Sequence, residues 1–157
     1  MVRIEMDNGA IIDIELYPDK APKTVANFEK LVKEGFYDGL TFHRIIRGFM
    51  IQGGDPEGTG MGGSKDSIYG EFAINGFPQN DLKHTKGVIS MARTQEPNSA
   101  SSQFFIMHED APHLDGSYAA FGKVVDGIDA VDEIAATPTG RFDRPVVPVV
   151  IKKMSII

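Results

Sequence analysis

The feature that most restricts the fold of this sequence is a series of short apolar segments separated by turn-forming residues. Most of these segments alternate apolar and polar residues, which is the pattern of a strand with one buried face. The first two, residues 2–6 and 10–16, flank Asp7-Asn8-Gly9. Asn-Gly between alternating segments is a strong hairpin signal, because both central positions of such a turn need a positive φ. The chain is therefore expected to begin with a β-hairpin.

Similar segments continue along the chain and predict the remaining strands. They lie at residues 42–46, 49–51, 88–92, 103–107, 119–125 and 146–157. Pro145 and Pro148 confine the beginning of the last strand to a sheet edge or a bulge, because proline has no N–H to donate to a ladder.

Only two segments repeat apolar residues at helical spacing. Helices are expected over residues 22–34, with Pro22 at the first helical position, and over residues 127–136. About eight strands and two helices without βαβ alternation predict a mainly β fold. A closed barrel and a sandwich both fit this pattern, and we favour a closed barrel because the two α-helices are suited to plugging its open ends. Residues 1–157 are expected to form a single domain.

Composition argues against several classes of function. Cysteine is absent, which removes disulfides and thiol catalysis and suits a reducing cytoplasm. No apolar run approaches the roughly 18 residues of a membrane span, and no signal peptide is expected. The net charge of −6, spread along the chain, argues against nucleic acid as a partner. No heptad pattern suggests assembly, so the expectation is a cytoplasmic monomer without a membrane partner.

The most informative stretch for function is residues 42–55, which read FHRIIRGFMIQGGD. Alternation in a strand sends successive side chains to opposite faces, so Phe42, Arg44 and Ile46 are expected to share a face. Met50 and Gln52 share a face in the following segment for the same reason. One surface is thus expected to carry a guanidinium, a thioether and a carboxamide among apolar neighbours. From spacing alone, the favoured interpretation of Arg44 is a surface arginine on a sheet or one half of a structural ion pair.

Other motifs carry weaker signals. Residues 58–63 match the dinucleotide-binding pattern G-x-G-x-x-G, but no helical period follows to receive a pyrophosphate, so a flexible surface loop is favoured. His108, Asp110 and His113 match no zinc spacing, and no serine lies in a nucleophile elbow. The sequence therefore predicts neither a metal nor a cofactor.

Four motifs in order along the chain resemble the cyclophilins, a family of peptidyl-prolyl cis–trans isomerases. They are FHRIIRGFMIQGGD at 42–55, GVISMAR at 87–93, SQFFI at 102–106 and LDGSYAAFGKV at 114–124. The resemblance covers nearly the whole chain. It implies catalysis of rotation about X–Pro peptide bonds, assistance to protein folding, and proline-containing peptides or flexible protein segments as partners. The implied fold is an eight-stranded antiparallel barrel capped by two helices.

The resemblance also implies roles for individual residues. Arg44, Phe49 and Gln52 match catalytic positions, with Arg44 as the central cation and Phe49 as a wall of the proline pocket. The positions implied to bind substrate are Met50, Ala92, Arg93, Gln103, Phe105, His113, Leu114 and Tyr118.

Three of these positions depart from many relatives. Arg93 stands where asparagine is common, and Tyr118 stands where histidine is common. His113 replaces a tryptophan that helps many eukaryotic members bind cyclosporin, so weak cyclosporin binding is expected. Two alternatives stay open at this point: a proline-peptide binding or chaperone module with little catalysis, and a hollow barrel that carries a ligand.

Overall fold

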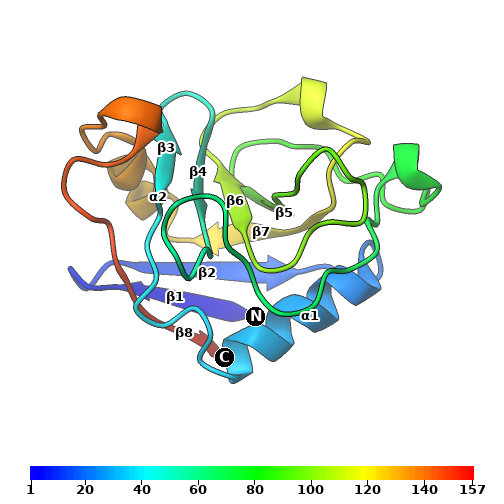
Figure 1. The fold of residues 1–157 in the computed structure, drawn as a ribbon, viewed down its shortest axis with the longest axis horizontal. Coiled ribbons are helices and arrows are strands. Elements are labelled where there is room, and N and C mark those ends of the chain that lie inside the picture. Colours follow the sequence, from blue (N-terminus) through cyan, green and yellow to red (C-terminus); the bar gives the residue numbers. More distant parts are fainter.

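The computed structural model describes residues 1–157 as eight β-strands, two α-helices and three short 3-10 turns (Figure 1). The strands are β1 Val2–Met6, β2 Ile11–Leu16, β3 Arg44–Ile46, β4 Met50–Gly53, β5 Val88–Met91, β6 Phe104–Met107, β7 Ala120–Asp126 and β8 Ile151–Ile156. The helices are α1 Pro22–Lys33 and α2 Ile128–Ala135, and the turns are η1 Ala73–Asn75, η2 Pro112–Leu114 and η3 Arg141–Asp143. The predicted number and type of elements are confirmed.

The eight strands form one curled antiparallel sheet in the order β3-β4-β6-β5-β7-β2-β1-β8. The expected closed barrel is wrong, because the sheet stays open between its edge strands β3 and β8. Only an isolated bridge between Thr41 and Val150 joins the segments that precede these two strands. Backbone hydrogen bonds join residues 39–42 to residues 149–151 around this bridge. Pro148 has no N–H, so the pairing does not extend from there along β3. The result is a half-barrel.

The last strand is also shorter than predicted. It begins at Ile151, whereas the sequence pattern extended it back to residue 146. Val146 and Val147 are instead 67% and 70% exposed, between Pro145 and Pro148. The prolines therefore exclude the whole segment from the sheet.

The opening hairpin is confirmed, with a different turn from the one expected. Val2 and Ile4 pair with Ile14 and Ile12. The N–H of Met6 bonds to the carbonyl oxygen of Ala10, so the loop holds three residues, of which only Gly9 has a positive φ, 89°. A three-residue loop needs a left-handed residue only at its last position, which is why a single glycine suffices.

Helix α1 packs its buried face against side chains of β6 and β7. Its buried face is Thr24, Val25, Phe28, Leu31 and Val32. The Phe28 ring lies 5.1 Å from that of Phe121 and 5.6 Å from that of Phe104. At the start of the helix, the buried carboxylate of Glu71 accepts hydrogen bonds from the Thr24 N–H and hydroxyl, both at 2.7 Å. In Figure 1, β3 and β4 lie at the opposite end of the view from α1.

A second, smaller apolar cluster lies apart from this main core. It contains Met50, Val88, Phe105, Met107, Ala111, Leu114 and Ala120. Because these residues come from β4, β5, β6, η2 and β7 or their flanks, the cluster gives a rigid base to the surface between those elements. None of the helices is long and apolar enough to span a membrane.

Candidate active site

The pairing of β3 with β4 sets which side chains share a surface. Arg44 stands opposite Gln52, and Ile46 stands opposite Met50. Ile45 and Ile51 alternate to the other side and lie in the main core. The expectation that Arg44, Met50 and Gln52 share a face is therefore confirmed. The expectation for Phe42 is wrong: it lies two residues before β3, outside regular alternation, and is fully buried in the main core.

An apolar pocket of about 130 Å³ opens beside this pair of strands. Its lining brings together nine of the residues singled out in the sequence: Arg44, Phe49, Met50, Gln52, Ala92, Arg93, Phe105, Leu114 and Tyr118. They come from β3, β4, β6, η2 and the segments around them, so the pocket exists only in the folded sheet. Gln103 and His113 lie beside the pocket instead of lining it. The His113 ring packs against Phe49 with ring centroids 5.7 Å apart.

A chain of amide groups connects Arg44 to the glycine-rich loop. Nη1 of Arg44 lies 3.3 Å from Oε1 of Gln52, and Nε2 of Gln52 donates to Oε1 of Gln103 at 2.9 Å. Nε2 of Gln103 then donates to the carbonyl oxygens of Gly60 and Gly62, at 3.0 and 2.7 Å. Each carboxamide donates on one side and accepts on the other, so its orientation is fixed. This arrangement leaves the Gln52 oxygen toward Arg44.

Arg93 forms the opposite wall of the pocket. Its guanidinium lies 4.6 Å from the Tyr118 ring centre and 4.8 Å from that of Phe72, in cation–π contact with both. Its Nε and Nη2 donate to the carbonyl oxygen of Ser117. Arginine suits this position because a planar cation can stack on two rings and still donate at its edge. Asparagine is too short for the same contacts, so the departure at Arg93 builds a different wall.

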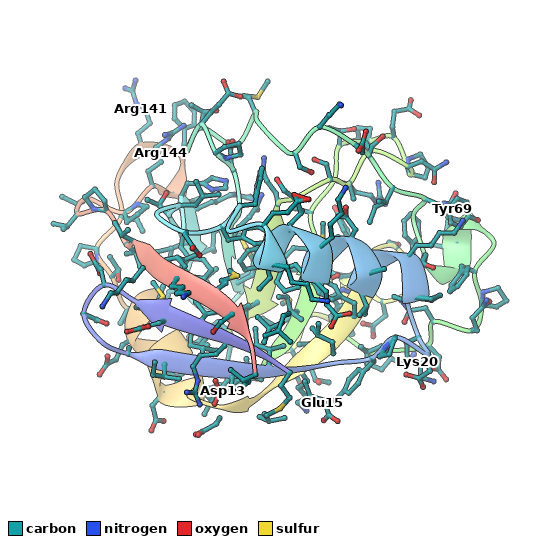
Figure 2. The ribbon with its side chains drawn as sticks, turned by 90° about the horizontal axis from the view of Figure 1, so that it is seen from below. Asp13, Glu15, Lys20, Tyr69, Arg141 and Arg144 are labelled. Carbon is teal, nitrogen blue, oxygen red and sulfur yellow. The ribbon has the colours of Figure 1, made fainter.

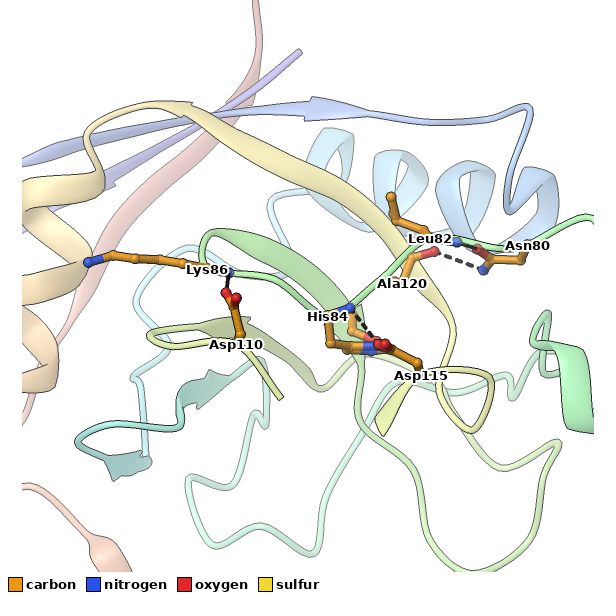
Figure 3. A network of polar contacts seen from close by, with 8 residues as sticks. Asn80, Leu82, His84, Lys86, Asp110, Asp115 and Ala120 are labelled. Atoms are coloured by element: carbon orange, nitrogen blue, oxygen red, sulfur yellow. Dashed lines mark hydrogen bonds and ion pairs between the residues drawn. The ribbon is translucent and has the colours of Figure 1, made fainter. Parts of the chain in front are cut away.

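A buried polar group supports the pocket from beneath, and sequence reasoning missed it. The ring of His84 stacks on Phe105, with centroids 6.0 Å apart. Its Nδ1 lies 3.1 Å from an Asp115 carboxylate oxygen (Figure 3). Its Nε2 lies 2.9 Å from the Ser90 hydroxyl. Burial lowers the pKa of His84, although Asp115 acts in the opposite direction. The three partners of His84 come from separate segments of the chain, so no local spacing in the sequence predicts them.

The glycine-rich loop has a structural role that the sequence did not suggest. The buried Asp55 carboxylate accepts the N–H groups of Glu57, Thr59, Gly60 and Gly62, at 2.6 to 3.2 Å. Burial alone would raise the pKa of Asp55, but these bonds together hold it below its usual value. A side chain at Gly62 would collide with that carboxylate. The glycines thus let the loop wrap Asp55, and no helix follows them that could receive a pyrophosphate.

The three residues weighed as metal ligands point to different partners. Nδ1 of His108 accepts the Gly48 N–H, Asp110 accepts the Lys86 N–H (Figure 3), and His113 packs against Phe49. No group of three or more His, Asp or Glu side chains is arranged to hold a metal ion.

Comparison with known proteins identifies the family. The family model described as cyclophilin type peptidyl-prolyl cis-trans isomerase/CLD matches residues 1–156. The chain belongs to the cyclophilins. A peptidyl-prolyl cis-trans isomerase of Arabidopsis thaliana is 45% identical over 146 residues, which are 92% of this cyclophilin and 89% of the relative. Peptidyl-prolyl cis-trans isomerase B of Bacillus subtilis is 52% identical over 124 residues, or 79% and 82% of the two chains.

The fold has a solved neighbour as well. The cyclophilin type isomerase of Cryptosporidium parvum, crystallised in the presence of the dipeptide Ala-Pro, superposes with a TM-score of 0.90 at 36% identity. The match covers 99% of this cyclophilin and 98% of the neighbour. This cyclophilin is thus a peptidyl-prolyl cis–trans isomerase. The alternative of a hollow barrel that carries a ligand is no longer needed, because the isomerase family model matches residues 1–156.

Proposed function

We propose that this cyclophilin holds a substrate proline in the 130 Å³ pocket while Arg44 donates a hydrogen bond to the prolyl nitrogen. One observation carries the proposal: an exposed arginine, without an acidic partner, stands at the edge of an apolar pocket and is aligned by Gln52. A cation in this position is available to a bound peptide. In this proposal Phe49, Met50, Phe105 and Leu114 surround the ring.

The reaction requires neither a nucleophile nor a metal. Rotation about an X–Pro bond is opposed by amide resonance, with a barrier of about 18–20 kcal/mol. In the twisted transition state conjugation is lost, so the prolyl nitrogen becomes pyramidal and basic. The planar nitrogen of the ground state accepts hydrogen bonds poorly. Donation from Arg44 therefore stabilises the transition state more than the substrate, which is the condition for catalysis.

The transition-state stabilisation that the reaction requires is moderate. An increase in the rate constant of cis–trans exchange from about 0.01 to about 1000 per second is five decades, or roughly 7 kcal/mol. One charged donor in a partly dry site supplies about 3–4 kcal/mol. Anchoring of the proline ring and of the peptide backbone along Ala92 and Arg93 supplies the remainder, because one side of the bond stays fixed while the other turns. An apolar pocket also disfavours the polar planar amide.

The proposed substrates are proline-containing peptides and flexible protein segments, whose folding the enzyme assists. The Ala-Pro dipeptide named with the Cryptosporidium parvum neighbour supports this substrate class. We further propose a cytoplasmic location, in keeping with the absence of cysteine, and a monomeric state, in keeping with the lack of a heptad pattern. Weak binding of cyclosporin is proposed from the exposed imidazole of His113 beside Phe49.

The proposal is tested by NMR exchange spectroscopy of an Ala-Pro peptide, with the wild type and with the Arg44→Ala variant. The expected result is rapid exchange between cis and trans peptide that is lost in a folded Arg44→Ala protein. Tight peptide binding without exchange in the wild type would support the binding module instead.

A further inference from the structure

A second hollow, of about 530 Å³, lies next to the proline pocket over β3. Arg44 and Gln52 line both spaces, so a peptide seated in one reaches the other without leaving the surface. The far wall is the turn at η3, with Phe142, Asp143 and Arg144. His43 lines the space between the two walls.

The charges in this hollow are unequal. Arg44 and Arg144 are cationic, Asp143 is the one acidic residue in its lining, and neither arginine takes part in an ion pair. Arg144 is held in place by donating from Nη1 to the Gly58 carbonyl oxygen at 3.1 Å and from Nη2 to that of Thr59 at 3.0 Å. A guanidinium has five N–H groups, so donors remain after these two bonds. A fixed cation with free donors is suited to a carboxylate.

His43 adds a buried polar ring to the lining of the hollow. The residue is only 6% exposed, and its ring nitrogens are enclosed beside the Gln103 carboxamide, so His43 does not itself donate to a ligand. Burial lowers the pKa of His43, with the nearby positive charge of Arg144 acting in the same direction and Asp55 opposing it.

The turn that carries Arg144 is strained. Phe142 and Asp143 have φ values of 60° and 59°, in the left-handed region that side chains other than glycine seldom adopt. The N–H of Gly140 bonds to the Arg144 carbonyl oxygen at 2.8 Å and closes the turn. Phe142 is left 76% exposed at the edge of the hollow. Strain of this kind persists where the surroundings impose it, and it concentrates at ligand sites.

The order of strands places the hollow relative to a bound peptide. The neighbours β3-β4-β6-β5 run from Arg44 on one side of the pocket to the Ala92–Arg93 edge after β5 on the other. Residues held along Ala92 lie on one side of the proline. Residues on the other side of the proline then pass over β3, beside Arg44 and toward Arg144.

We propose that this hollow is a substrate subsite for a carboxylate side chain, with Arg144 as the residue that selects it. The carboxylate belongs to a peptide residue on the side of the proline away from Ala92 and Arg93. The inference rests on the proposed role of the pocket and of Arg44, and it adds a preference among the substrates of the isomerase.

Two series of proline peptides test the subsite, with Glu, Gln or Lys placed either two residues before or two residues after the proline. Exchange is measured by NMR at low salt. In one series only, kcat/KM for the Glu peptide should exceed that for the Gln peptide about three- to fivefold, as for an exposed charge pair. The Lys peptide should be the slowest in that series. Salt should reduce these differences.

Matched variants assign the preference. Arg144→Gln should bring the Glu-to-Gln ratio to about one. Arg141→Gln removes the same charge from the same turn (Figure 2). Arg141 does not line the hollow, so the ratio should persist. Asp143→Asn should raise the ratio, because it removes the competing carboxylate. Unfolding of the turn would lower the Glu-to-Gln ratio in both the Arg144 and the Asp143 variant, so a higher ratio in Asp143→Asn cannot come from unfolding.

Three outcomes would overturn the subsite: a ratio near one in both wild-type series, a ratio that survives Arg144→Gln, or equal losses in Arg144→Gln and Arg141→Gln. Exchange of the uncharged Gln peptide measures isomerisation without the charge preference, so it shows whether the subsite alone has failed. If the wild type accelerates exchange of no peptide in either series, the proposed role of the pocket and of Arg44 fails, and the subsite fails with it.

Discussion

Arg44 and Gln52 face each other across the β3–β4 pair, with Nη1 of the arginine 3.3 Å from the carboxamide oxygen. The register of two adjacent strands fixes this relationship. Gln52 is itself held by Gln103, so the position of the guanidinium depends on a side chain two strands away from its own.

Removal of the Arg44 guanidinium should abolish most catalysis without unfolding the protein. Arg44→Ala is expected to lower kcat/KM about 100- to 1000-fold, the usual cost of losing a donor made for the transition state. The side chain is exposed, so the far-ultraviolet circular dichroism and the midpoint of thermal unfolding should change little. Arg47→Ala is the control, since it removes an exposed arginine of the same hairpin that does not line the pocket. Equal losses in both variants would contradict the assigned role.

The amide chain behind Arg44 should be measurable separately. Gln103→Leu keeps the approximate volume but removes the acceptor for Gln52 and the donors to Gly60 and Gly62. We expect kcat/KM to fall about tenfold, because one or two hydrogen bonds that orient Gln52 are lost. Gln79→Leu, at an exposed position away from the site, is the matched control. Unchanged kinetics in Gln103→Leu would show that Gln52 is positioned without the relay.

The sequence predicted much of this arrangement because its signals are local. Alternation placed Arg44, Met50 and Gln52 on one face, and turn residues separated the strands. The convergence of Ala92, Phe105 and Leu114 on the same pocket followed from the family resemblance, since alternation carries no information about distant pairs. The open edge between β3 and β8, the wrapped carboxylate of Asp55 and the partners of His84 depend on contacts between remote segments. No pattern in a single segment encodes them.

The Arg93 wall should contribute to binding more than to the chemical step. Arg93→Asn removes two cation–π contacts and the bonds to the Ser117 carbonyl oxygen. We expect KM to rise severalfold and the free energy of unfolding to fall by about 1–2 kcal/mol, with a smaller effect on kcat. A double-mutant cycle with Tyr118→Leu measures the coupling, expected at about 0.5–1 kcal/mol. Additive effects of the two changes would mean that the Arg93–Tyr118 contact adds no stability.

Buried histidine should make the protein less stable in mild acid. The folded pKa of His84 lies below its ordinary value of 6.5, because burial disfavours the charged ring. Between the two pKa values the unfolded chain binds a proton that the folded chain does not. Stability is therefore full above about pH 6.5 and falls as the pH drops toward the folded pKa, by up to about 1.4 kcal/mol per pH unit for one histidine. Burial also lowers the pKa of His43, so this residue likewise reduces stability as the pH falls.

Urea unfolding at a series of pH values from 5 to 8 checks this expectation. His84→Gln keeps a group able to bond to Ser90 but has no titrating ring. The slope of its free energy of unfolding against pH should therefore be smaller than that of the wild type by the equivalent of about one proton. The remaining slope contains the contribution of His43 and, toward pH 5, that of carboxyl groups such as Asp13 and Asp55, whose folded pKa values are also lowered. A variant with the wild-type slope would exclude His84 as a source of the pH dependence.

Cyclosporin affinity should respond to residue 113. The exposed imidazole of His113 packs on Phe49, and Trp is larger and more apolar at the same place. The additional apolar contact of His113→Trp, roughly 60 Å² at about 25 cal/mol per Å², corresponds to about a tenfold tighter Kd. Isothermal titration of wild type and variant with cyclosporin measures the difference. His113→Leu separates apolar area from aromatic shape, because it should give a smaller gain. An affinity that is the same in all three proteins would show that residue 113 does not contact the drug.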